Sequence, residues 1–116
     1  FGAPQVTRRL TRAAGRPMDA HAWSAWLGGK ALIAAAVAAT KGPAAAFATA
    51  LAKAELDGSK GVAMSFRLWD GQLRQPLLLG DGQAVIATAP AEGILHPTNQ
   101  LDAIGADAPE KLCKAR

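Results

Sequence analysis

The spacing of apolar residues at the start of the chain predicts a helix from Pro4 to Arg16. Four apolar positions recur at i, i+4, i+7 and i+8, the spacing of one helix face. These positions are Val6, Leu10, Ala13 and Ala14. We expect this stripe to be buried and the arginines on the opposite face to be solvated. Gly15 and Pro17 are expected to end the helix.

A second apolar segment predicts a longer helix from Ala20 to about Thr40, with Asp19 as its N-cap. The large side chains expected on its buried face are Trp23, Trp26, Leu27, Ile33 and Val37. Gly28 and Gly29 lie mid-helix, where each costs roughly 1 kcal/mol relative to alanine, so a neighbouring element is expected to approach closely there. Only ten uncharged residues separate Lys30 from Lys41. A bilayer requires about 20, so this is predicted to be a buried core helix.

The third predicted helix opens at Pro43, a residue suited to the first turn, and runs to about Ala54. Phe47, Leu51 and Ala54 follow one another at helical spacing and are expected to share a face. The first half of the chain is therefore predicted to be helical.

Beyond the third helix the pattern changes to short extended segments between turns. Three Asp-Gly pairs predict the turns, because glycine adopts positive φ freely and aspartate bonds its own downstream backbone. The pairs are Asp57-Gly58, Asp70-Gly71 and Asp81-Gly82. The segments expected to be extended are Gly61–Arg67, Gln75–Leu79 and Gln83–Thr88. In the first of them, period-two alternation places Met64, Phe66 and Leu68 on one side and Ser65 and Arg67 on the other.

These elements divide the chain into three predicted parts. Residues 1–60 form a helical segment, residues 61–88 a strand-turn-strand segment, and residues 89–116 an irregular tail that contains three prolines. A short helical turn is predicted at Glu110–Lys114. We refer to residues 61–88 as the hub. Trp69 lies in its central turn and is expected either to cover the hub strands or to stay exposed; the first interpretation is favoured because exposed tryptophan usually has a reason.

The order of residues around the hub suggests a family. The run consists of Asp57-Gly58, Gly61, Met64-Ser65-Phe66, Trp69-Asp70, Gln72 and Gln75-Pro76-Leu77. Preceded by two helices, it resembles the C-terminal part of type I periplasmic substrate-binding proteins of ABC importers, in particular the leucine/isoleucine/valine-binding branch. The resemblance covers nearly the whole chain but only the last third of such a receptor. It implies an α/β fold in which three helices belong to the first lobe and short strands to the second.

The resemblance also implies a function and a site. Such a receptor captures a small amino-acid-like or other small organic ligand between its lobes and delivers it to a membrane permease. It implies a periplasmic protein, exported by a signal peptide, of which this chain is a fragment. In such a receptor the start of the second helix lines the cleft. The free N–H groups and the helix dipole at this position suit polar ligand groups. The ligand-binding residues would be Asp19, His21 and Trp23.

The residues alone leave alternatives open at that site. Trp23 is favoured as a core residue because tryptophan is mostly buried by area, whereas His21 fits ligand contact and a capped surface position equally. The chain begins with Phe1-Gly2 and not with methionine, which predicts processed or partial material, and no signal peptide is visible in it. The single Cys113 is either an unpaired thiol or half of a disulfide with a partner elsewhere.

Charge and chemistry narrow the function classes. The net charge of +4 divides into +5 for residues 1–41 and −1 for residues 42–116. A basic first third is compatible with nucleic acid, but the arginine spacing is typical of one solvated helix face and no nucleic-acid-binding motif is present. No phosphate loop, nucleophile elbow or metal-ligand spacing occurs, so we expect no enzyme, cofactor or metal. Asp70 and Asp81 are interpreted as turn residues in preference to paired acids.

Two expectations concern the whole chain. The alternative function is a small non-enzymatic interaction module that docks through its alanine-rich helices. On the fragment interpretation, the chain alone is not a stable monomer, because the helices lack the remaining N-terminal part of the receptor or another chain to pack on. The apolar faces expected to be exposed contain Trp23, Trp26, Leu27 and Phe47.

Overall fold

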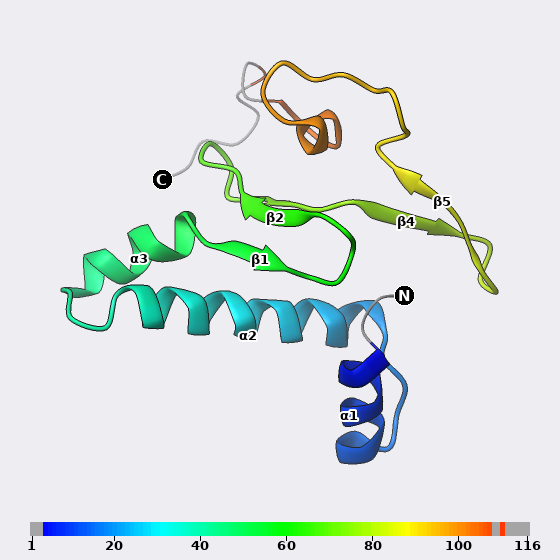
Figure 1. Ribbon diagram of the computed structural model, residues 1–116, viewed down its shortest axis with the longest axis horizontal. Helices are drawn as coiled ribbons and strands as arrows, with labels where there is room; N and C mark the ends of the chain where they lie inside the picture. Colours follow the sequence, from blue (N-terminus) through cyan, green and yellow to red (C-terminus); the bar gives the residue numbers. More distant parts are fainter. Residues whose placement is uncertain (1–3, 108–109, 111–116) are drawn as a thin grey trace. The chain divides into compact units, whose positions relative to one another are not determined.

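The chain is a small mixed α/β protein in the computed structural model, which describes residues 4–107 and residue 110 (Figure 1). Cys113 and all but the first residue of the turn predicted at Glu110–Lys114 lie outside the described residues. The helices are α1 (Pro4–Ala14), α2 (Ala20–Ala38), α3 (Ala44–Ala52) and the 3-10 helix η1 (Gln100–Ala103). The strands are β1 (Glu55–Asp57), β2 (Ala63–Phe66), β3 (Leu73–Arg74), β4 (Leu77–Gly80) and β5 (Val85–Ala89). The chain divides into two compact units, Phe1–Ser65 and Phe66–Arg116.

The core of the first unit is the face of α2 that carries mainly small residues. Helix α3 folds back along α2, and β1 runs beside α2 on the same side (Figure 1). Leu27, Ala31 and Ala35 recur every four residues on this face and are 3%, 3% and 0% exposed. Alanine permits close approach of the neighbouring backbone, which explains why this face is the one covered. Strand β1 pairs antiparallel with β2, and the partners Leu56 and Met64 are both buried.

This packing corrects the predicted face of α2. Ile33 and Val37 were expected in the core but are 66% and 68% exposed, because they lie outside the arc that α3 and β1 cover. Leu27 is buried, as expected for the core face of this helix, whereas the exposure expected for it in the isolated chain is not found. The close approach expected at Gly28 and Gly29 is also absent, since a Cβ added at either would meet no atom within 4 Å among the described residues.

Helix α1 matches its predicted start but not its predicted burial. It ends at Ala14, and Gly15 follows with φ +66°, which confirms glycine as the terminator. None of its residues is buried: Val6 and Leu10 are half-buried, and Ala13 and Ala14 are exposed. The predicted buried stripe is therefore wrong, since two of its four positions are exposed and none is fully buried.

The three Asp-Gly turns are confirmed, and in each the aspartate bonds its own downstream backbone as expected. The Oδ1 of Asp57 accepts from the Ser59 N–H (2.8 Å), and that of Asp70 accepts from the Gln72 N–H (2.9 Å). Asp81 Oδ1 accepts from two successive backbone N–H groups, both at 2.9 Å. Each carboxylate therefore closes its own turn, as the turn interpretation of these aspartates required.

Gly58 is needed for space and not for positive φ. A Cβ at this position would lie 2.0 Å from Met64 Cε and 3.0 Å from Trp23 Cζ2. Positive φ in this turn is instead adopted by Ser59 (+59°) and Gly61 (+84°). The missing side chain of Gly58 lets the loop pack directly on Met64 and on the Trp23 ring.

The predicted extended segments exist with shorter bounds, and two strands were missed. Strand β2 lies inside the predicted Gly61–Arg67, β4 begins two residues later than predicted, and β5 begins at Val85. The two short strands β1 and β3 were not predicted. In the second unit, β4 pairs antiparallel with β5, with an irregularity between Leu79 and Gly80. None of the described helices is long and apolar enough to cross a membrane.

The alternation predicted across Met64–Leu68 fails at its end. Arg67 is 2% exposed and Leu68 is 79% exposed, the reverse of the prediction. The strand ends at Phe66, and the backbone then turns, with the Arg67 N–H donating to the Gln72 carbonyl (2.8 Å) and the Gly71 N–H to the Arg67 carbonyl (3.0 Å). The period of two no longer applies within that turn.

Candidate functional site

The predicted ligand site begins at the N-terminus of α2, where Asp19 acts as the N-cap. Its Oδ1 accepts from the Ala22 N–H (2.7 Å) and its Oδ2 from Arg16 Nη1 (2.8 Å). The hydrogen bond from Ala22 lowers the pKa of the Asp19 carboxyl, and the charge of Arg16 adds to this. The carboxylate of Asp19 thus already provides negative charge at this helix end, where we expected a ligand group.

His21 and Trp23 face different surroundings. Two residues along a helix correspond to a rotation of about 200°, so their side chains leave α2 in nearly opposite directions. His21 is exposed, and Trp23 is half-buried. Lys60 Nζ lies 4.2 Å from the centre of the Trp23 ring. Trp23 therefore supports the turn after β1, while the ligand contact predicted for His21 stays a prediction.

A second lysine holds β1 against α2. Lys30 Nζ lies 4.9 Å from the centre of the Trp26 ring and donates to the Asp57 carbonyl (2.5 Å). Burial lowers the pKa of Lys60, the lysine that lies over the Trp23 ring. Both tryptophans of α2 thus pair with a lysine through cation–π contact.

An open cleft of about 450 Å³ lies along β1 and the following loop. Its lining consists of Glu55, Leu56, Asp57, Gly61, Val62 and Ala63. None of Asp19, His21 and Trp23 lines it. The exposed carboxylates of Glu55 and Asp57 stand on a short strand, where charge discourages pairing with a foreign strand.

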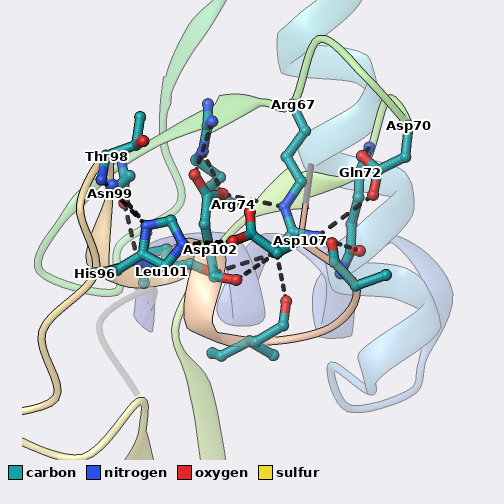
Figure 2. Close-up of polar contacts among 12 residues, drawn as sticks. Arg67, Asp70, Gln72, Arg74, His96, Thr98, Asn99, Leu101, Asp102 and Asp107 are labelled. Carbon is teal, nitrogen blue, oxygen red and sulfur yellow. Dashed lines mark hydrogen bonds and ion pairs between the residues drawn. The ribbon is translucent and has the colours of Figure 1, made fainter. Parts of the chain in front are cut away.

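The second unit is built around a buried cluster of two arginines and one aspartate (Figure 2). Arg67 and Asp102 are 2% and 1% exposed, and Arg67 Nε lies 3.1 Å from Asp102 Oδ1. Arg74 forms a two-point contact with the same carboxylate, Nε to Oδ1 at 2.7 Å and Nη2 to Oδ2 at 3.0 Å. We call Arg67, Arg74 and Asp102 the arginine cluster. Such a bidentate arrangement is the strongest form of the arginine–carboxylate pair.

The remaining donors of Arg67 are satisfied within the unit. Its Nη1 donates to the Ala106 carbonyl (2.9 Å) and the Gln72 Oε1 (3.2 Å), and its Nη2 to the Ile104 carbonyl. One side chain thus links the turn at 67–72 to the chain after η1, as Figure 2 shows. Because these contacts engage its guanidinium donors, Arg67 has a structural role within this unit.

Opposing effects act on the pKa of the Asp102 carboxyl. Burial raises the pKa of its carboxyl, but hydrogen bonds and charge from Arg74, followed by those from Arg67, lower it more, and the net pKa lies below its ordinary value. Burial of an ionised carboxylate is tolerated because two cations face it.

Trp69 packs against both arginines of the cluster. The guanidinium carbons of Arg67 and Arg74 are each 5.3 Å from the centre of its ring. Its Nε1 is buried and, within the described residues, has no hydrogen-bond partner. Trp69 therefore covers the arginine cluster. It is half-buried, so the interpretation in which it stays exposed is wrong.

His96 forms a second polar centre in the same unit. Its Nε2 lies 3.1 Å from Asp107 Oδ2, and its Nδ1 accepts from the backbone N–H groups of Thr98 and Asn99, both at 3.2 Å (Figure 2). The imidazole is mostly buried, at 13% exposure. Sequence reasoning missed this centre and the arginine cluster because each carboxylate lies 11 to 35 residues from the histidine or arginine that it contacts. Among the described residues, no three His, Cys, Asp or Glu side chains are placed to hold a metal ion.

Comparisons with models of known families, with curated proteins and with solved structures found no match for this chain.

Proposed function

We propose that the chain is part of the solute-binding component of an ABC importer, which captures a small amino-acid-like or other small organic ligand between two lobes. Its partners are the ligand, the remaining receptor polypeptide and a membrane permease, and it works in the periplasm without catalysing a reaction. The motion it would contribute to is hinge closure around the ligand.

The observation that carries the proposal is the run of elements that contains the family-like residues. Helices α2 and α3 precede β1 and β2, and Phe66 ends β2 before the turn at Asp70-Gly71. That turn leads through β3 to Pro76 and then to β4. This order of a strand, a closed turn and a strand entry supports the proposal, because the resemblance implies the same order.

The exposed side of α2 supports a docking role. We call Leu32, Ile33 and Val37 the outer face of α2; they are 51%, 66% and 68% exposed. An α-helix that is apolar on both sides is typical of a helix covered on both sides in the assembled protein. In the proposed receptor the covering part is the remaining polypeptide; in the alternative function, an interaction module, it is a separate protein.

Ligand binding tests the proposal most directly. We expect the complete receptor to bind one or more free amino acids or small organic acids in calorimetric titration, and its radius of gyration in X-ray scattering to fall on binding. His21→Ala is expected to weaken binding by roughly 1–2 kcal/mol, the size of a lost hydrogen bond with partial desolvation. Lys53→Ala, at the C-cap of α3, is the matched surface control.

Cell fractionation separates the two functions. Release of the complete protein by osmotic shock, together with solute binding, supports the receptor. Retention in the cytoplasmic fraction, with no heat signal from any solute of the panel, would contradict it and favour the interaction module. Unchanged affinity in His21→Ala would move the site to residues outside this chain.

A further inference from the structure

The hydrogen bonds of His96 define its tautomer. Nδ1 accepts from the N–H groups of Thr98 and Asn99, so this nitrogen must carry a lone pair. The ring proton must then lie on Nε2, which faces the Asp107 carboxylate at 3.1 Å. Only a neutral imidazole satisfies all three contacts. An imidazolium would direct a third N–H group at the two backbone donors.

The turn that His96 holds leads directly into η1. Asn99 is the N-cap of η1: its Oδ1 accepts from the Leu101 N–H (2.9 Å) and its carbonyl from the Asp102 N–H (2.8 Å). Asp102 in turn lies between Arg67 and Arg74. The ring of His96 is therefore connected, through one capped turn, to the buried carboxylate of the arginine cluster.

We infer that His96 is a pH-operated latch, which fixes the turn at residues 96–99 when its ring is neutral and releases the Thr98 and Asn99 N–H groups when the ring takes a proton. Histidine is the side chain whose ordinary charge change falls between about pH 5 and 8. The latch is independent of the ligand and transport function proposed above.

The charged neighbours determine which part moves. Asp107 contacts Nε2, and its attraction grows when the ring becomes positive, so the ring stays at Asp107. Glu110 Oε1 accepts from the Asp107 N–H (3.3 Å) and adds a second negative charge on that side. On the side of η1, Asp102 is compensated by its two arginines. Protonation therefore frees the backbone at residues 98–99 and leaves the imidazole in place.

Nitrogen-15 NMR tests the tautomer first. In a His21→Gln background, His96 is the only histidine of the chain. At pH 8 we expect the ring shifts of a neutral imidazole that is protonated at Nε2. A ring protonated at Nδ1, or one that exchanges between both tautomers, would overturn the inference.

Amide hydrogen exchange tests the release. When the pH is lowered from 8 to 5, protection of the Thr98 and Asn99 amides should fall about tenfold beyond the intrinsic pH effect, as expected for one or two lost hydrogen bonds. Protection of Met64 in β2, outside this unit, should not change. A simultaneous loss at Met64 would indicate general unfolding, and constant protection at 98–99 would exclude a latch; both results overturn the inference.

Two variants complete the test. In His96→Asn the side-chain oxygen can accept from the same backbone groups but cannot titrate, so the fall in protection with pH should disappear. In Asp107→Asn the imidazolium loses its anionic partner, so the fall in protection should shift to lower pH. A fall that persists in His96→Asn, or that does not move in Asp107→Asn, would assign the effect to another group.

Discussion

At the scale of single residues, Arg67 shows how a charge becomes a core residue. Its guanidinium is 2% exposed, yet it faces Asp102 and the carbonyls of Ile104 and Ala106. A buried ion is tolerated when a counter-ion and hydrogen bonds replace its water shell. Asp102 has the complementary role, because two arginines donate hydrogen bonds to its two oxygens at the same time. Removal of this single carboxylate would take the shared counter-ion from both arginines, while Arg67 would keep its longer contact with Asp70 Oδ2 (3.4 Å).

The first prediction is that Asp102→Asn destabilises the protein by about 3–5 kcal/mol, the range for removal of one partner from a buried ion pair. Urea unfolding at pH 7 measures it. Asp81→Asn is the matched control: Asp81 is exposed and closes its turn through Oδ1, which an asparagine oxygen can replace. If both substitutions cost the same, the arginine cluster does not have the assigned role.

The second prediction concerns the pH dependence of the same carboxyl. Because the folded pKa of Asp102 lies below its ordinary value of 3.8, its stabilising effect is complete above that value and is lost as the pH falls below it. The stability difference between wild type and Asp102→Asn should thus be constant from pH 7 to about 5 and shrink below about 4. A difference that grows as the pH falls would reverse the sign and contradict the assignment.

At the scale of elements, the features that depend on neighbouring residues in the sequence could be predicted, whereas those that depend on tertiary contacts could not. The cap at Asp19, the terminator Gly15 and the three Asp-Gly turns were predictable, because each depends on residues within three or four positions. The covered face of α2 was not, because α3 and β1 select small Ala31 and Ala35 over the larger Ile33 and Val37. The arginine cluster was also invisible, since Arg67 follows the strand as its alternation ends.

The third prediction compares two glycines of the first unit. Gly28→Ala should stabilise the protein by about 0.5–1 kcal/mol, because a Cβ there meets no atom within 4 Å and alanine is the better helix former. Gly58→Ala should destabilise it by about 1–3 kcal/mol, since its Cβ would overlap Met64 and press on Trp23. Thermal unfolding of both variants measures the pair. Equal shifts would show that Gly58 is not packed as described.

At the scale of the whole molecule, apolar surface remains on both units. The outer face of α2 belongs to the first unit, and Leu79 and Ile86 of the β4–β5 hairpin, 47% and 70% exposed, belong to the second. The expected exposure of Trp23, Trp26 and Phe47 is only partly met, since all three are half-buried by their own unit. A free surface of this kind is typical of a region that another polypeptide covers.

The last prediction tests whether another polypeptide covers the outer face of α2. In this chain alone, Ile33→Gln should change the free energy of unfolding by less than about 0.5 kcal/mol, because Ile33 is 66% exposed. Ala35→Gln, on the opposite face at 0% exposure, should cost more than about 1 kcal/mol through overpacking. If the chain is part of the proposed receptor, Ile33→Gln in that complete protein should cost about 1.5–3 kcal/mol, since a covered isoleucine loses its burial there. Urea unfolding of the three variants and of their two unsubstituted parent proteins gives the comparison. If Ile33→Gln is equally mild in both contexts, the outer face of α2 faces water in the receptor as well, and the proposed packing of this helix on the remaining polypeptide is wrong.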